Sequence, residues 1–127
     1  MENTTNFKHF RIDNQVDLYI CKNSKFKTNL IQFVLINPLN KETVSKNALV
    51  PFIIYRGSKK YPNSRDFKIH LDELYGAELS VSIWKRGENQ IINFSLEIVN
   101  EKYLPTDESL LEKGFELIKE LILNPLF

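Results

Sequence analysis

The amino-acid sequence predicts a single α+β domain whose helices pack on one face of an antiparallel or mixed sheet. Segments with a two-residue apolar period, typical of strands, are interspersed with segments that have the three- and four-residue spacing of helices. The 127 residues fit one domain with one core, and they contain no repeat, linker or low-complexity segment. The expected order of elements is βββααββα.

Three strands are expected first. Residues 7–12 and the alternating residues 16–21 pair around a turn at Asp13-Asn14. Residues 30–36 form a nearly continuous apolar run rich in β-branched side chains. This composition predicts a central strand that is covered on both faces.

A helix is expected over residues 40–55, with Asn40 as its N-cap and Gly57 just past its end. Its second half is apolar almost all round, which predicts a buried rather than an amphipathic helix. Pro51 lies inside it, removes one backbone donor and predicts a kink near Asn47.

The next helix is expected over residues 64–75, capped by Ser64 and closed by Gly76. Its apolar side chains fall at positions that share one face. These are Phe67, Leu71, Leu74 and Tyr75.

The clearest strand signal covers residues 77–84, and a turn at residues 86–89 returns the chain into a second strand. The inward side chains of the pair are Ala77, Leu79, Val81 and Ile83 on the first strand and Ile92, Phe94, Leu96 and Ile98 on the second. The last helix is expected to start near Thr106-Asp107 and to end before Pro125. Its predicted buried stripe is Leu111, Phe115, Ile118 and Ile122.

Composition points to a soluble protein in a reducing compartment. The net charge of +1 gives no global field for nucleic acid or an acidic membrane. Cys21 is the single cysteine, so no intrachain disulfide forms, and we interpret it as a small apolar strand residue. Neither a secretory signal nor an apolar membrane span is present, which predicts a cytoplasmic location. The apolar final residues, 123–127, suggest a fragment of a longer chain.

The residues that could carry hydrolytic chemistry do not form a set. His9 is expected in a strand and His70 on the exposed face of a helix, with Asp66 as the only acidic residue at ligand spacing. We interpret both as surface histidines. Ser64 is explained as a cap, and no G-x-S-x-G motif surrounds a serine. The adjacent carboxylates Asp72 and Glu73 diverge on a helix and do not suit an acid–base pair.

An RNA-binding site is a further alternative. Arg56, Lys59, Lys60 and Arg65 follow a helix and are interleaved with aromatic side chains that stack on bases in such sites. Those aromatic residues are Tyr55 and Tyr61.

Several segments together resemble the amino-terminal domain of the insulinase-type (pitrilysin-type) zinc peptidases, especially bacterial processing-peptidase-like proteins. The resemblance spans nearly the whole chain and is carried by several moderate motifs. They are Tyr55-Arg56-Gly57-Ser58-Lys59-Lys60-Tyr61-Pro62, Leu71-Asp72-Glu73-Leu74-Tyr75-Gly76-Ala77-Glu78-Leu79, Val99-Asn100-Glu101-Lys102-Tyr103-Leu104 and Leu121-Ile122-Leu123-Asn124-Pro125-Leu126.

The resemblance implies a lost zinc site. Active members carry H-x-x-E-H on the helix that precedes the glycine matching Gly57; two histidines hold zinc and the glutamate activates water. Here those positions hold Ala48, Pro51 and Phe52, which neither ligate a metal nor move a proton. The third ligand of active members would fall beyond Phe127. No catalytic residue, metal ligand or cofactor is therefore expected in this chain.

The resemblance also implies a peptide-binding strand. In active members an edge strand receives the substrate main chain by β-addition. Their Asn-Ala, Thr and Glu pattern is eroded here to Ser80 and Val81, with Ile83 and Arg86 at the later positions. The residues expected to flank a bound peptide are Glu78, Ser80, Ser82 and Trp84, although an ordinary sheet strand explains them as well.

Three functions follow as hypotheses. The first is a non-catalytic homologue that pairs with an active insulinase-like subunit, or with the remainder of its own chain, and helps bind extended peptides. The second is zinc metalloendopeptidase activity that appears only in the full-length or partnered protein. The third is a small RNA- or protein-binding module.

Overall fold

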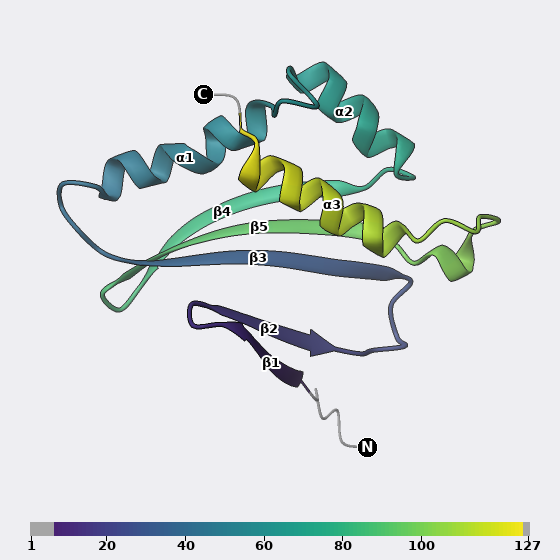
Figure 1. The fold of residues 1–127 in the computed structure, drawn as a ribbon, viewed down its shortest axis with the longest axis horizontal. Coiled ribbons are helices and arrows are strands. Elements are labelled where there is room, and N and C mark those ends of the chain that lie inside the picture. The colour runs from purple at the N-terminus through teal and green to yellow at the C-terminus, as the bar shows by residue number, and fades with distance from the viewer. Residues whose placement is uncertain (1–6, 126–127) are drawn as a thin grey trace.

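The computed structural model describes residues 7–125, and the predicted order βββααββα is confirmed within them. Two antiparallel sheets are present: a hairpin of β1 and β2, and a three-stranded sheet in the order β3-β5-β4 (Figure 1). The strands are β1 (Phe7–Asp13), β2 (Val16–Cys21), β3 (Thr28–Pro38), β4 (Glu78–Arg86) and β5 (Asn89–Val99). The helices are α1 (Val44–Arg56), α2 (Ser64–Glu73), the 3₁₀ turn η1 (Glu101–Tyr103) and α3 (Leu110–Leu123).

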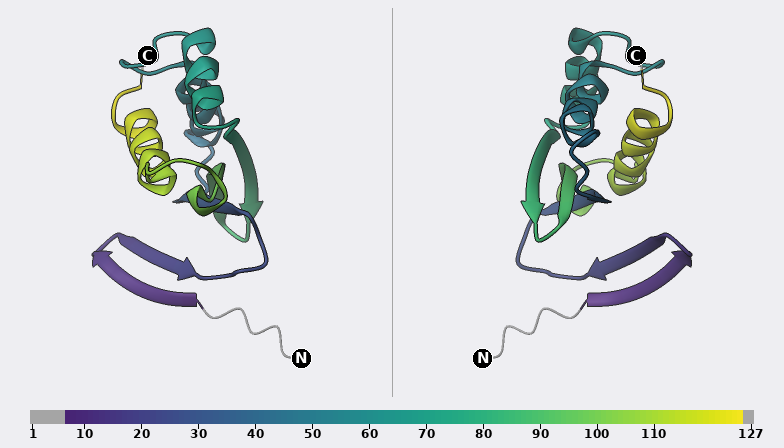
Figure 2. Two further views of the ribbon diagram at one scale, coloured as in Figure 1. Left: turned by 90° about the vertical axis from the view of Figure 1, so that its right-hand side faces the viewer. Right: turned by 90° about the vertical axis from the view of Figure 1, so that its left-hand side faces the viewer.

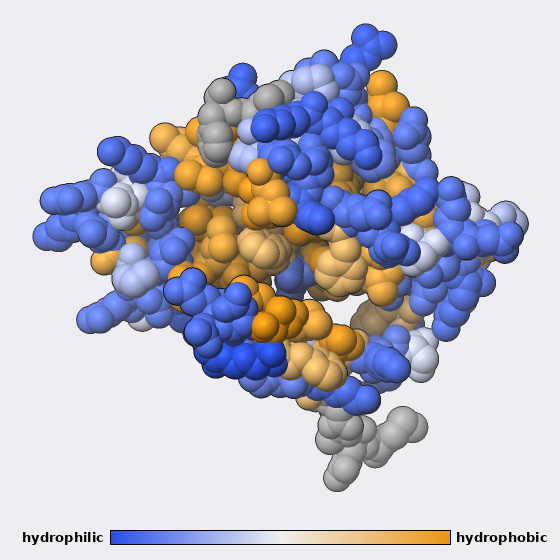
Figure 3. Space-filling view, in the orientation of Figure 1, coloured by the Kyte–Doolittle hydropathy of each residue, from blue (hydrophilic) through white to orange (hydrophobic). Residues whose placement is uncertain are grey.

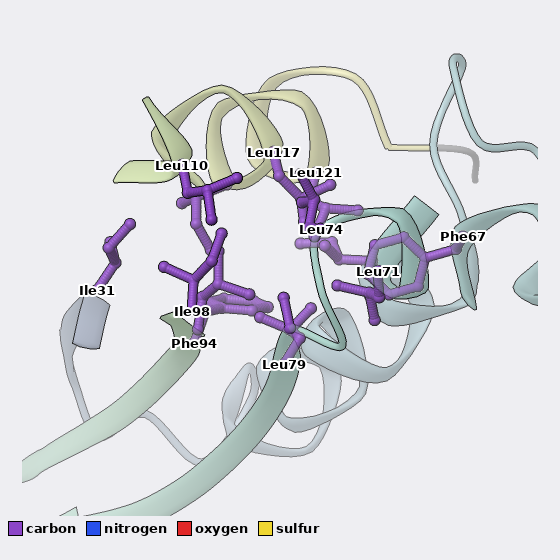
Figure 4. Close-up of a cluster of buried hydrophobic side chains, with 14 of the residues drawn as sticks. Ile31, Phe67, Leu71, Leu74, Leu79, Phe94, Ile98, Leu110, Leu117 and Leu121 are labelled. Carbon is purple, nitrogen blue, oxygen red and sulfur yellow. The ribbon is translucent and has the colours of Figure 1, made fainter. Parts of the chain in front are cut away.

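All three α-helices lie on one face of the three-stranded sheet, as the sequence predicts, and the hairpin stands apart from them (Figure 2). The core fills the space between the inner sheet face and the helices (Figure 4). Its centre is formed by side chains that are almost completely buried. These include Phe94, Leu96 and Ile98 of β5, Phe67 and Leu71 of α2, and Leu110, Leu117 and Leu121 of α3.

The position of β3 differs from the prediction of a central strand. Only β5 pairs with it among the described strands, so β3 is an edge. Its inner face packs on the core, whereas Leu30, Val34 and Ile36 point outward and are 60%, 46% and 63% exposed. The strand has the composition of a doubly covered strand, but nothing in the described part of the chain covers its outer face.

Helix α1 starts later and is less buried than its composition predicts. The side chain of Asn40 accepts a hydrogen bond from the Glu42 amide at 2.9 Å in a turn that precedes the helix. Pro51 is buried within a helix that continues to Arg56, but Leu49 and Phe52 are 61% and 60% exposed. The prediction of a buried helix is therefore wrong, because only one side of α1 meets the sheet.

The caps of the other helices also differ from the prediction. Asn63, not Ser64, caps α2, because its Oδ1 accepts a hydrogen bond from the Asp66 amide at 2.8 Å. Helix α3 begins after Ser109, whose hydroxyl accepts from the Glu112 amide at 3.3 Å. The expected start near Thr106-Asp107 is three residues too early.

The buried stripe of α3 is displaced from the predicted one. Ile118 is buried as expected, but Leu111 and Phe115 are 38% and 49% exposed. The true stripe is Leu110, Gly114, Leu117, Ile118 and Leu121. Gly114 explains the shift, because a Cβ there would stand 2.8 Å from Cδ1 of Ile31 and the bare backbone lets the helix approach the sheet at this point.

Candidate functional site

The three positions at which the resemblance to insulinase-type peptidases predicts zinc chemistry lie on α1, and none of them holds a metal-ligating side chain. Ala48 is half-buried, Pro51 is buried and Phe52 points into solvent. Across residues 7–125, no group of three or more His, Cys, Asp and Glu side chains gathers to hold a metal ion.

His9 is engaged within the hairpin. Its Nε2 lies 2.8 Å from Oδ1 of Asp17, and its ring stacks on Tyr19 with centroids 4.6 Å apart. The side chains of His9 and Asp17 are substantially exposed, in agreement with the prediction of a surface histidine.

His70 lies on a partly buried face of α2, so its predicted place on the exposed face of the helix is wrong. Its ring stacks on Tyr61 with centroids 4.4 Å apart, and Nδ1 is 3.8 Å from a carboxylate oxygen of Glu73. Burial lowers the pKa of His70, and the nearby Glu73 carboxylate opposes this effect only in part. Asp66 is not its partner, because that carboxylate accepts from the side chain of Asn63.

The two adjacent carboxylates of α2 diverge, as predicted. Asp72 lies 3.7 Å from Nζ of Lys68, whereas Glu73 faces His70. Two carboxylates with separate partners do not share one substrate as acid and base.

The loop of residues 57–62 is bound to the end of α3, a relationship that the sequence did not reveal. A carboxylate oxygen of Glu120 accepts from the Lys60 amide at 2.8 Å, and the Lys59 amide donates to the Asn124 carbonyl at 2.9 Å. Ser58 is fully buried and also bonds Glu120. This loop holds the lysines of the RNA alternative. Of its two aromatic residues, Tyr61 already stacks on His70, whereas Tyr55 packs edge-on against Phe67 and is 40% exposed.

Strand β4 presents the most distinctive open surface. It pairs with β5 alone among the described strands, so its other edge is unpaired. Arg86 and Asn89 form the last pair of the ladder around the two-residue turn, which makes them a hydrogen-bonded pair. Hydrogen-bonded pairs then recur at every second residue, so the even-numbered residues of β4 bond β5.

The odd-numbered residues of β4 therefore direct their N–H and C=O groups to the open edge. These are Leu79, Val81, Ile83 and Lys85. Ala77, the odd-numbered residue just before β4, follows the same pattern. Its amide turns away from β5 and donates to the Leu71 carbonyl at 3.1 Å. The side-chain pattern predicts only the neighbouring side chains; the two-residue turn is the sequence signal that could have identified these backbone groups.

The side chains that were predicted to flank a peptide lie on the outer sheet face, beside this edge. Glu78, Ser80, Ser82 and Trp84 are all exposed. Beside the start of β4, a shallow hollow of about 310 Å³ is lined by residues that include Tyr55, Lys68 and Leu79. Glu78 and Glu97 also line this hollow, so an aromatic ring and charges of both signs stand next to the open edge.

None of the helices in the described part of the chain combines the length and apolar character that crossing a membrane requires.

No protein-family model matches the chain. A Bacillus subtilis protein named "Probable inactive metalloprotease YmfF" is 45% identical over 107 residues, which are 84% of this chain and 25% of that protein. A crystal structure described as "a conserved protein from Enterococcus faecalis" superposes with a TM-score of 0.92 at 30% identity, over 97% of this chain and 29% of the other. The chain thus spans between a quarter and a third of the length of these relatives. The relative's name agrees with the expectation that this chain is not an enzyme: over most of its length, the chain is a homologue of part of an inactive metalloprotease-like protein.

Proposed function

We propose that this chain is a non-catalytic homologue of the insulinase-type zinc peptidases that acts as a subunit or part of a processing peptidase. It binds extended peptide segments along the open edge of β4, or presents that edge to an active partner. The empty ligand positions on α1 and the name of the Bacillus relative support the non-catalytic part.

The observation that carries the peptide-binding part is the row of backbone groups on β4. Leu79, Val81 and Ile83 direct unpaired N–H and C=O groups outward in the described structure, at the spacing that an added strand requires. Such pairing depends on the main chain, so it survives the loss of the family's side-chain pattern.

The character of this edge also suits reversible binding. Lys85 and Arg86 are exposed charged residues at its end, and serines occupy the outer face. Charged and polar side chains keep an open edge from permanent association, while a peptide still reaches the backbone.

Hydrogen exchange resolved by residue tests this proposal directly. The probe is a synthetic peptide of about ten residues with alternating apolar and polar side chains, long enough to pair along the whole strand. We expect it to slow exchange at the amides of Leu79, Val81 and Ile83. The amides of Ser80 and Ser82 already bond β5 and serve as internal controls.

Val81→Pro supplies the matched variant, because proline removes an outward-facing donor and leaves the β5 ladder intact. Peptide affinity is expected to fall about tenfold, the effect of losing one hydrogen bond of roughly 1.4 kcal/mol. The proposal is contradicted if saturating peptide does not change the exchange rates of the β4 edge amides in the unsubstituted chain.

The non-catalytic part is tested by metal analysis and peptide cleavage. Purified chain is expected to contain no stoichiometric zinc and to cleave no peptide. Zinc at one ion per chain together with cleavage by this chain alone would reverse the proposal. Cleavage by a longer, unpartnered chain would instead favour activity that needs the rest of the protein.

A further inference from the structure

A second open surface lies at the opposite edge of the three-stranded sheet, along β3. The apolar composition of β3 is that of a strand with neighbours on both sides, yet its outer face exposes Leu30, Val34 and Ile36. An uncharged apolar edge of this kind is normally paired or covered, because it otherwise recruits other chains.

Two hydrogen bonds at the ends of the β3–β5 ladder show which residues of β3 direct their N–H and C=O groups toward β5 and which direct them toward the open edge. The Asn100 amide donates to the Lys27 carbonyl at 2.9 Å, and the Leu39 amide donates to the Glu88 carbonyl at 2.7 Å. Both bonds continue the register of the β3–β5 ladder, and hydrogen-bonded pairs recur at every second residue. The odd-numbered residues of β3 therefore bond β5. The backbone groups that face the open edge belong to Thr28, Leu30, Gln32, Val34 and Ile36.

The hairpin stands opposite this edge without pairing to it. No ladder joins β2 to β3 in the described residues, and Figure 1 shows β2 running alongside β3 in the opposite direction. Figure 3 shows apolar surface on both sides of an opening between the hairpin and the rest of the molecule. One face of the hairpin carries Phe10, Val16, Leu18 and Ile20, of which only Leu18 is half-buried.

The connection between the two strands leaves room for another strand. Residues 22–27 separate β2 from β3. Six residues extend to about 20 Å, while skipping one strand position requires roughly 10 Å. A hairpin with adjacent strands would need only two to five residues.

The directions of β2 and β3 restrict where in the sequence a strand between them can come from. Because β2 and β3 run in opposite directions, any strand between them is parallel to one of the two. Parallel neighbours require a long crossover, so the strand comes from a distant segment of sequence.

The exposed area of the chain and the greater length of a structural relative both fit such a segment. The chain exposes 9687 Å², whereas a folded monomer of 14.9 kDa exposes about 7,000 Å². The Enterococcus structure superposes on 97% of this chain at a TM-score of 0.92, and the matched part is 29% of that longer polypeptide.

We propose that the space between β2 and β3 is a slot for one β-strand from the remainder of a longer polypeptide of which residues 1–127 form one part. The strand joins the hairpin and the three-stranded sheet into one continuous sheet. It has at least the six residues of β2 and carries apolar side chains, because both of its neighbours present apolar faces. This edge is distinct from the β4 edge and does not depend on peptide binding there.

Hydrogen exchange of the 127-residue chain and of the product of the complete reading frame tests the slot. The amides of Leu30, Gln32, Val34 and Ile36 are expected to exchange on the order of 100-fold more slowly in the longer protein. The edge amides of β4, in the absence of peptide, are expected to exchange equally in both. Equal rates at β3 in the two proteins overturn the proposal. So does a reading frame that ends at Phe127, or protection of β3 that depends on dimerisation of the 127-residue chain.

A pair of proline variants separates the slot from ordinary destabilisation. Val34→Pro and Val81→Pro each remove one N–H that faces an open edge, so both are expected to lower the thermal midpoint of the 127-residue chain by similar amounts. In the longer protein Val34→Pro is expected to lower it by several degrees more than Val81→Pro. Equal effects in the longer protein contradict the slot and leave the peptide proposal at β4 untouched.

Discussion

The carboxylate of Glu120 on α3 accepts a hydrogen bond from the backbone amide of Lys60, sixty residues earlier, at 2.8 Å. The same carboxylate accepts from the Asn124 side chain at 2.7 Å. These bonds form a junction between the loop after α1 and the last turn of α3, and thereby hold the two helices together.

Glu120→Ala is expected to destabilise the chain by about 2 kcal/mol, the usual effect of losing hydrogen bonds to a charged group. Glu116→Ala, one turn earlier on the exposed face, is the control and should stay within about 0.5 kcal/mol of the wild type. Urea unfolding followed by circular dichroism measures both. Equal effects of the two substitutions would show that the junction contributes nothing specific.

The junction also predicts acid sensitivity. Burial alone would raise the pKa of Glu120, but hydrogen bonds from Asn124, the Lys60 amide and Ser58 outweigh it and lower the pKa. The stabilisation is thus present above the carboxyl pKa of the unfolded chain, near 4.3, and is lost as pH falls through the lower folded value. Glu120→Gln should flatten the decline of stability below about pH 4. An unchanged acid limb of the stability curve would contradict this assignment.

His70 predicts a second pH dependence at higher pH. Its lowered pKa means that its stabilisation is complete above the unfolded value of about 6.5 and is lost as pH falls through the folded value. His70→Phe keeps an aromatic ring against Tyr61 and removes the titration. Urea midpoints measured between pH 8 and pH 5 should therefore fall less in the variant. If the urea midpoint of the variant falls with pH as steeply as that of the wild type, the pH dependence comes from another titrating group.

The cap of α2 provides a simple test of the corrected helix start. Asn63→Ala removes the side-chain bond to the Asp66 amide and should cost about 1 kcal/mol. Ser64→Ala at the first helical position should change stability by less than about 0.5 kcal/mol. Thermal unfolding of the two variants decides between the residues, and a larger loss for Ser64→Ala would favour the original sequence-based assignment.

Gly114 is expected to be intolerant of large side chains. Gly114→Leu drives atoms into Ile31 and Leu96 and should destabilise by about 2–3 kcal/mol, whereas Glu116→Leu on the exposed face should be near neutral. Adding Ile31→Ala to Gly114→Leu vacates part of the contact, so the double variant should lose less than the sum of the single effects. Strict additivity would show that the close approach is not the cause.

Most of the fold was predictable because each element is defined by neighbours in sequence. The alternation of β4 and β5 and the order of elements can both be read locally. The face of α3 was not predictable, since adjacent apolar pairs such as Leu110 and Leu111 satisfy the helical period in two phases.

The sequence by itself determined the strand and helix content, the absence of a zinc-binding motif and the apolar character of β3 on both faces. Only the tertiary structure decided that β3 is an edge strand, that Gly114 sets the contact face of α3, and that the outward backbone of β4 belongs to Leu79, Val81 and Ile83. The physical reason is that the spacing of apolar residues shows only which side chains of one segment share a face. Which partner lies against each side depends on contacts between residues that are distant in the chain.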